Sequence, residues 1–197
     1  MDFSINIKGH ELEYFDDEHI YLVDGILVPS ITTIMKVRFG GKYSTVDRET
    51  LERARNHGTE VHEVIQNYYE HGIKANIDEL RDMQFLERTY GFDVIETETP
   101  VILFKDDKPI SAGRIDLVLA TDDAIGGADI KTTSALDKEY LFYQLNLYRI
   151  AYEQTYGVKW TFLKGIHLKP PKRKYVDIPI NEELAWGIVK EWEETNE

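Results

Sequence analysis

The chain has 197 residues, of which 42% are hydrophobic and 30% charged, a balance typical of one globular domain with a buried core. It contains no cysteine, which excludes disulfides, thiol chemistry, cysteine-bound zinc and iron–sulfur clusters. No window reaches the roughly 18 apolar residues of a membrane span, and the N-terminal sequence lacks the pattern of a signal peptide. We therefore expect a cytoplasmic protein without a membrane partner.

The formal net charge of -13 counts against a nucleic-acid partner, because phosphate groups are bound mainly by Lys and Arg. Acidic residues, however, gather in segments typical of solvated surface, above all residues 181–197. A metal site also requires carboxylates, and its bound cation reverses the local field. We therefore expect a weaker nonspecific affinity for DNA than a basic protein would show.

Hydrophobic periodicity predicts an alternation of short strands and longer helices. Ser30 and Asn181 are the expected N-caps of their helices, and Gly58 lies inside the longest helix, where it costs about 1 kcal/mol relative to Ala. In chain order we predict strands at residues 11–15 and 19–23, helices at 31–37, 50–71 and 77–90, strands at 92–104, 112–120 and 124–132, a helix at 138–156, strands at 160–168 and 174–180, and a last helix after Asn181.

This order predicts an α/β protein in which helices flank a central mixed β-sheet. No repeat, low-complexity tract or linker interrupts the chain. We therefore predict a single domain over residues 1–197, with N-terminal strands over about 1–45, a core over about 46–180 and a C-terminal helix over about 181–197.

Charged residues stand within two of the most apolar predicted strands. Asp116 interrupts one strand, and Asp129 and Lys131 lie two apart on the next, so that they share a face while Ile130 points the other way. Such charges are costly to bury unless something compensates them. A divalent cation bound by the two carboxylates would do so, and oxygen ligands suit Mg²⁺ or Mn²⁺. The carbonyl of Ile130 lies between the key side chains and is a further candidate ligand.

The simpler interpretation of Asp129 and Lys131 is a buried salt bridge without catalytic meaning. In the metal interpretation, Lys131 would orient or help deprotonate an attacking water and stabilise charge that develops on a phosphate. The metal would lower the pKa of that water.

Three motifs occur in a fixed order along the chain. The central motif consists of Asp116 and the D-x-K sequence of Asp129 and Lys131. A helical G-x-x-x-H motif at residues 58–62 precedes it, and a helical Q-x-x-x-Y motif at residues 144–148 follows it. Over about residues 50–152 this order resembles the PD-(D/E)XK nuclease superfamily, in particular its RecB-type branch with the phage exonucleases. The resemblance implies a restriction-endonuclease-like core.

The resemblance also implies roles for individual residues. It makes His62, Asp116 and Asp129 metal ligands and Lys131 catalytic, with Gln144 and Tyr148 beside the active site. From the helical pattern alone, His62 is better explained as a core histidine, whereas Tyr148 could equally be a core residue or part of the site. The absence of cysteine separates the chain from the iron–sulfur members of this branch.

Some residues outside these motifs could contact a substrate. Ser30 and Thr32 lie at a predicted helix start, where free N–H groups attract anions, although Ser30 could be only a cap. Arg114 shares a strand face with Asp116 and could bind a phosphate or simply pair with an acidic neighbour. The basic segment 169–174 could grip DNA or form a solvated loop. We leave Glu96 and Glu98, which end a strand nearby, outside the predicted site.

These patterns together predict a metal-dependent deoxyribonuclease, with exonuclease the preferred mode, in phage-type recombination, repair or DNA degradation. The host cytoplasm would then be its compartment, DNA its substrate and a single-strand annealing or recombination protein a possible partner. One alternative is a noncatalytic protein of the same fold that binds a protein partner or mimics DNA through its acidic surface. Another is a small phosphohydrolase with a different acidic metal site. The oligomeric state is not predicted.

Overall fold

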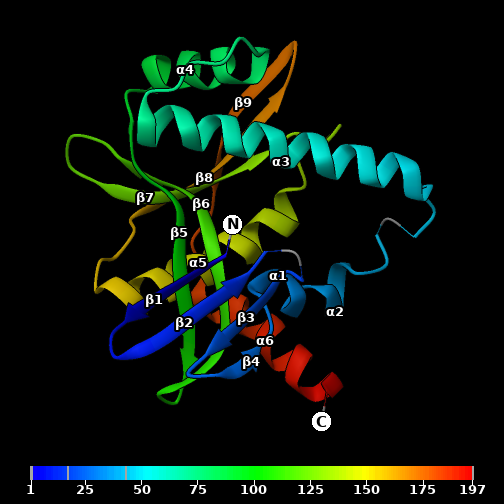
Figure 1. The fold of residues 1–197 in the computed structure, drawn as a ribbon, viewed down its shortest axis with the longest axis vertical. Coiled ribbons are helices and arrows are strands. Elements are labelled where there is room, and N and C mark those ends of the chain that lie inside the picture. Colours follow the sequence, from blue (N-terminus) through cyan, green and yellow to red (C-terminus); the bar gives the residue numbers. More distant parts are fainter. Residues whose placement is uncertain (1, 17, 43, 197) are drawn as a thin grey trace.

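The computed structural model describes residues 2–16, 18–42 and 44–196. Over these residues the chain folds into two β-sheets and six helices (Figure 1), which confirms the mixed α/β class. Within the same ranges, no helix combines the length and the hydropathy that a membrane span requires.

The first sheet is an antiparallel meander at the N-terminus. Only its two middle strands were predicted, because the outer two are short and largely exposed. Asp24 and Gly25 both have left-handed backbones (φ 53° and 74°), which is the geometry of a tight hairpin turn. The strands, in spatial order, are β1 (Phe3–Ile7), β2 (His10–Phe15), β3 (Ile20–Val23) and β4 (Ile26–Val28).

The second sheet has five strands in sequential order, and only its β7–β8 pair is parallel. A parallel neighbour requires a crossover, which helix α5 supplies. The predicted turn at residues 105–109 is shorter than expected, because Asp106 and Asp107 alone form it with left-handed backbones. The elements are β5 (Asp93–Lys105), β6 (Lys108–Ala120), β7 (Ile125–Lys131), α5 (Lys138–Tyr156), β8 (Phe162–Lys169) and β9 (Lys172–Ile178).

The helices agree with the predictions except at residues 31–37, where two separate short helices stand in place of one. Both predicted caps are confirmed. The Ser30 hydroxyl accepts a hydrogen bond from the Thr33 amide at 3.0 Å, and the Asn181 side chain accepts one from the Leu184 amide at 3.0 Å. Besides α5, the helices are α1 (Ile31–Ile34), α2 (Lys36–Phe39), α3 (Arg48–His71), α4 (Asp78–Tyr90) and α6 (Glu182–Asn196).

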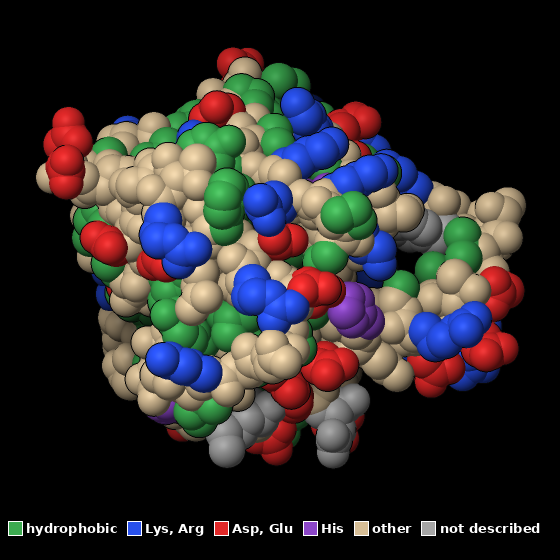
Figure 2. Space-filling view, turned by 90° about the horizontal axis from the view of Figure 1, so that it is seen from above, with side chains coloured by type: hydrophobic (Ala, Val, Ile, Leu, Met, Phe, Trp, Pro, Cys, Tyr) green, Lys and Arg blue, Asp and Glu red, His purple; other side chains and the backbone are tan. Residues whose placement is uncertain are grey.

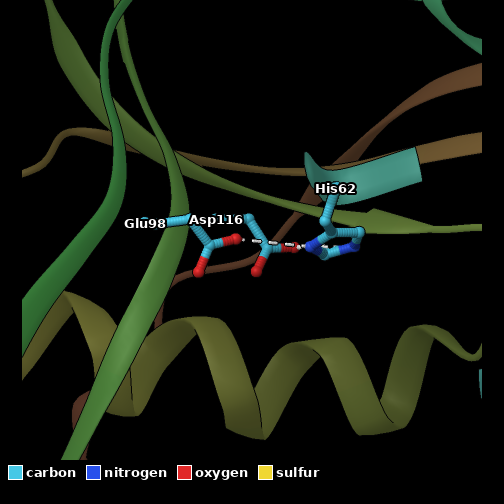
Figure 3. A group of neighbouring side chains, drawn as sticks. All are labelled: His62, Glu98 and Asp116. Atoms are coloured by element: carbon cyan, nitrogen blue, oxygen red, sulfur yellow. Dashed lines mark ion pairs between the residues drawn. The ribbon is translucent and has the colours of Figure 1, made fainter. Parts of the chain in front are cut away.

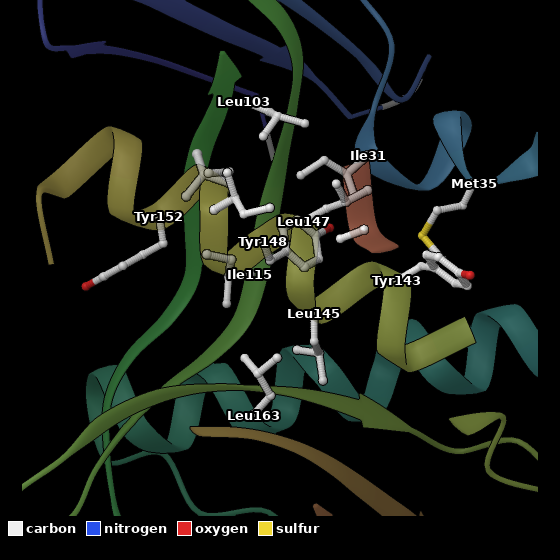
Figure 4. Packing of buried hydrophobic residues seen from close by; sticks show 14 of the residues in the cluster. Ile31, Met35, Leu103, Ile115, Tyr143, Leu145, Leu147, Tyr148, Tyr152 and Leu163 are labelled. Carbon is white, nitrogen blue, oxygen red and sulfur yellow. The ribbon is translucent and has the colours of Figure 1, made fainter. Parts of the chain in front are cut away.

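Helices pack on both faces of the second sheet. In Figure 1, α3 and α4 lie together on one side, and α5 and α6 on the other. Val61 and Ile65 of α3 share a core with Ile130 of β7. On the opposite face, α5 packs through Leu145 and its neighbours onto Leu163 of β8 (Figure 4). Strands β6 and β7 therefore run between two helical layers, with α3 on one side and α5 on the other.

Two consecutive glycines in β7 allow large side chains to pack against that strand. A Cβ atom on Gly127 would lie 2.0 Å from Cζ3 of Trp160, and one on Gly126 would lie 2.4 Å from Cδ2 of Phe162. Trp160 is fully buried, so its ring cannot move aside without disturbing the core. The absence of side chains here fixes how closely β7 and the start of β8 approach.

We expect Gly127→Ala to lower the free energy of unfolding by about 1–3 kcal/mol or more, because the added methyl overpacks the core. Gly187→Ala in α6 is the matched control. Its Cβ meets no atom within 4 Å, so helix propensity should make it stabilising by about 0.5–1 kcal/mol. Urea unfolding of both variants checks this, and a Gly127→Ala protein as stable as the parent would contradict it.

Candidate metal centre

Three potential metal ligands converge from three separate elements. His62 of α3, Glu98 of β5 and Asp116 of β6 each offer one ligand atom, and these atoms lie within 4.8 Å of one another. Figure 3 shows the imidazole pointing from the helix toward the two carboxylates on neighbouring strands. An imidazole and two carboxylates at this spacing could hold a divalent cation.

Hairpin register brings the two carboxylates together. The flanking pairs Thr97–Leu117 and Thr99–Ile115 place Glu98 directly opposite Asp116 in the antiparallel ladder. Glu98 adopts a left-handed backbone (φ 46°), which is uncommon for a residue with a side chain and costs on the order of 1–3 kcal/mol. A strained backbone at a candidate ligand suggests that the position of this side chain matters.

His62 is held above the carboxylates by contacts on both ring nitrogens. Its Nε2 lies 3.3 Å from the Ile130 carbonyl oxygen and 3.7 Å from Asp116, and its Nδ1 lies 3.5 Å from Glu98. One turn earlier on α3, a Cβ on Gly58 would lie 3.4 Å from the Thr132 hydroxyl. Gly58 thus allows α3 to approach the chain that follows β7.

The two aspartates of the predicted site take different positions. Asp116 accepts a hydrogen bond of 2.7 Å from the Ile130 amide and belongs to the three-ligand group. Asp129 lies outside that group and forms an ion pair of 2.5 Å with Lys131. It is 1% exposed, and neither of its oxygens finds a well-directed hydrogen bond within the described part of the chain. The predicted salt bridge and a role beside the metal group are both compatible with this position.

The electrostatics of the site are dominated by buried carboxylates. Burial lowers the pKa of His62, but the surrounding carboxylates, Asp116 foremost, outweigh it and raise this pKa to about 9. Burial raises the pKa of Asp129, and the charge of Asp116 raises it further. A site that favours the imidazolium in this way attracts cations in general.

Lys131 stays a cation in this environment. Burial alone would lower its pKa, yet the carboxylates of Asp129 and Asp116 raise it above the usual lysine value. A charged ammonium at this position can stabilise negative charge that develops on a phosphate. The further predicted role of Lys131, in orienting or helping to deprotonate the attacking water, stays a prediction.

Gln144 and Tyr148 both line the cleft that contains the carboxylates, the place that the family resemblance implies for them. Gln144 is 5% exposed, and its side-chain oxygen has no hydrogen-bond partner among the described residues. Tyr148 is buried in the core and packs so tightly on β6 that a Cβ on Gly113 would lie 2.8 Å from its Cε1 atom. Tyr148 therefore belongs to the core and also lines the cleft, so both predicted interpretations of this residue fit its position.

The residues predicted to contact substrate also border the cleft, with partners of their own. Ser30, Thr32 and Arg114 line it. Ser30 bonds to both Thr32 and Thr33 through its hydroxyl, in addition to its capping role. Arg114 also has the acidic neighbour that its alternative interpretation requires, because its Nε lies 3.4 Å from Glu98.

The basic segment 169–174 does not form the free loop that we expected. Strand β9 begins at Lys172, and Arg173 pairs with Asp82 at 2.6 Å and lies over the ring of Phe85. Lys169 alone of this segment lines the cleft, as far as the described residues show. A contact of this segment with DNA stays a prediction, now on an exposed hairpin instead of a loop.

The metal group lies in a cleft of about 1540 Å³, above the roughly 300–1000 Å³ of typical small-molecule sites. Its described lining includes six Lys or Arg and seven Asp or Glu, against 23 and 36 in the whole chain. On the face seen in Figure 2, cationic and anionic side chains are interspersed. Most of the negative charge is therefore carried outside the cleft.

Glu98 is the site residue that sequence reasoning left out. Its signal was an acidic residue on the hairpin partner of the strand that carries Asp116. Which acidic residue of β5 lies opposite Asp116 depends on the pairing register of β5 with β6. A bulge between Leu103 and Phe104 shifts this register by one residue. Without the bulge, continuation of the Lys105–Lys108 pair would bring Thr97 opposite Asp116 instead.

Comparisons with known proteins leave the chain without an assigned relative. No family model and no curated protein matches it. Among solved structures, the crystal structure of SSO0001 is similar over 85% of this chain and 75% of that one, with a TM-score of 0.46 and 13% sequence identity. A likeness at this level carries no argument about function, so any function must be inferred from the site.

The unpaired side-chain oxygen of Gln144 allows a prediction about the free energy of unfolding. A buried acceptor without a partner costs about 1–3 kcal/mol, so Gln144→Met should leave the free energy of unfolding unchanged or raise it by up to that amount. Asn146→Leu, two residues further along the same helix, is the matched control. The Asn146 amide donates to the Phe142 and Pro179 carbonyls and accepts from the Asn181 amide. Its loss should destabilise the protein by about 1–3 kcal/mol in urea unfolding.

A clear destabilisation by Gln144→Met would show that the oxygen has a partner in solution. The assay is run without divalent cations and with chelator, so that metal binding does not contribute to the measured stability.

Proposed function

We propose that the chain is a metal-dependent DNA nuclease of the PD-(D/E)XK superfamily, close to its RecB-type branch, on a restriction-endonuclease-like core. One observation carries the proposal. His62 and Asp116, from separate sequence motifs of that branch, meet in a single cation-attracting group beside the Lys131 ammonium on the wall of a wide cleft. Helices on both faces of a mixed sheet support the proposed core.

The available ligands fit Mn²⁺ or Mg²⁺. His62, Glu98 and Asp116 would hold the cation, and the Ile130 carbonyl lies next to the imidazole. Asp129 adds a buried carboxylate whose oxygens lack well-directed hydrogen bonds in the described structure, as expected of a group reserved for a cation or its water. When bound, such a cation polarises a phosphate and lowers the pKa of a water molecule.

Lys131 supplies a fixed positive charge at the reacting phosphate. Its ion pair with Asp129 orients the ammonium, and the surrounding carboxylates keep it charged. Negative charge that develops on the phosphate is stabilised by a cation already in place. The unpaired oxygen of Gln144 would accept a hydrogen bond from water or from Lys131 once substrate is bound.

The cleft is suited to a polymer with a negative backbone. It is larger than typical small-molecule sites, and its near balance of charges contrasts with the excess of acid elsewhere. A polyanion would therefore find its most favourable local field inside the cleft. We place the activity in phage-type recombination, repair or DNA degradation, with exonuclease as the expected mode and a recombination protein as a candidate partner.

The decisive experiment compares cleavage of linear and circular DNA with Mn²⁺, with Mg²⁺ and with EDTA. We expect metal-dependent degradation of linear DNA only, abolished by EDTA. Lys131→Met should lower kcat by about 10²–10³-fold, because it removes a group that stabilises the transition state. It should leave Mn²⁺ binding, measured by calorimetry, largely intact, whereas Asp116→Asn should weaken that binding.

Lys108→Met serves as the matched control, since Lys108 is exposed at the start of β6 and remote from the cleft lining. Equal activity of Lys131→Met and Lys108→Met would reject the proposed site. A protein that binds neither metal nor DNA would favour a noncatalytic binding protein with an acidic surface. Cleavage of circular DNA would replace the exonuclease mode with endonuclease activity.

A further inference from the structure

The N-terminal sheet, which lies outside every motif of the proposed nuclease, forms part of the cleft wall. Asp16, His19 and Tyr21 line the cleft together with Arg114. The sheet also packs on the β5–β6 hairpin through a core that includes Ile102 of β5. These strands therefore lie against the same hairpin that carries the carboxylates.

Arg114 joins the N-terminal sheet to the metal group. On one side its Nε lies 3.4 Å from Glu98. On the other, its guanidinium carbon lies 4.6 Å from the centre of the Tyr14 ring, and a terminal nitrogen lies 4.0 Å from Asp16. Its side chain is 25% exposed, so the guanidinium reaches the cleft while its contacts are with protein.

Tyr14 is itself fixed in place. It is 1% exposed, and its hydroxyl donates to Asp16 at 2.9 Å and lies 2.8 Å from Nδ1 of His19. Its ring also lies 4.7 Å from that of Tyr21, between ring centres. A buried, hydrogen-bonded ring presents a rigid face, and an arginine stacked on such a face loses less conformational freedom when it binds an anion.

We propose that strand β2 is a substrate-positioning element, in which Tyr14 and Asp16 hold the Arg114 guanidinium ready for a backbone phosphate of the polynucleotide. This inference rests on the proposed nuclease function and adds the N-terminal sheet to its substrate-binding surface. Tyr14 acts through Arg114 and is a positioning residue. The planar guanidinium suits two oxygens of one phosphate, which lysine cannot match.

The test is a double-mutant cycle on binding of a fluorescein-labelled linear oligodeoxynucleotide in EDTA, where cleavage is blocked, followed by kcat and KM with Mn²⁺. Tyr14→Leu should raise Kd and KM by about two- to fivefold, the loss expected for one cation–π contact of about 0.5–1 kcal/mol. It should leave kcat nearly unchanged. Tyr14→Phe keeps the ring face and should restore most of the affinity. In an Arg114→Ala background, Tyr14→Leu should have no further effect.

Phe3→Leu is the matched control, because Phe3 packs against the Tyr14 ring at 5.5 Å between centres, in the same core as the sheet. It should lower thermal stability without a change in KM. Asp16→Asn, at a partly exposed position, gives a second variant in case Tyr14→Leu does not fold, and it should raise KM in the same direction. Equal effects of Tyr14→Leu with and without Arg114 would overturn the proposal.

An NMR measurement tests the contact between Arg114 and Tyr14 independently of nuclease activity. The Nε–H resonance of Arg114 is assigned by its loss in Arg114→Ala. We expect this resonance to move on Tyr14→Leu, since the aromatic ring current is removed, and to stay near its position in Phe3→Leu. An unmoved resonance would overturn the positioning role. A wild-type protein that neither binds nor cuts DNA while the resonance moves would instead reject the proposed nuclease function.

Discussion

The site depends on the burial of like charges close together, which no folded chain tolerates without compensation. Three carboxylates, Glu98, Asp116 and Asp129, gather between two helical layers. In the absence of a bound metal their charge is offset by three cations: the His62 imidazolium, the Lys131 ammonium and the Arg114 guanidinium beside Glu98. Three elements of the fold bring these charged groups together. Helix α3 brings the imidazole, the β5–β6 hairpin brings two of the acids, and β7 brings the third acid with its ammonium partner. A bound divalent cation could take over the role of the imidazolium.

The arrangement also bears on how a strongly acidic chain could bind the polyanionic substrate of the proposed nuclease. The cleft lining is nearly balanced in charge, so the excess of acid lies elsewhere. Two polar residues of helix α5 differ in their hydrogen bonding. The side-chain nitrogen and oxygen of Asn146, toward α6, both form hydrogen bonds, whereas the side-chain oxygen of Gln144, toward the cleft, has no partner among the described residues. The first residue holds the fold together and the second keeps a polar group available.

Much of the fold could be predicted because it follows from local patterns. Residues close together in the chain determine the helical periods of α3 and α5 and the caps at Ser30 and Asn181. The same holds for the shared strand face of Asp129 and Lys131. Pairing between distant strands is different. The place of Glu98 depends on a single bulge, and the contact of Tyr14 with Arg114 joins positions 100 residues apart. Such contacts are fixed by tertiary packing, which periodicity does not encode. For the same reason the segment at residues 169–174 was taken for a loop, although Arg173 has a partner on α4.

The uneven distribution of charge has a kinetic consequence. At low ionic strength, where the Debye length is long, the net charge of -13 would repel the polynucleotide substrate of the proposed nuclease until the substrate reaches the cleft. Dissolved ions shorten the range of this repulsion more effectively than they weaken contacts formed inside a partly dry cleft. Encounter would therefore become faster when a little salt is added, the reverse of the behaviour of basic DNA-binding proteins, whose association slows as ionic strength rises.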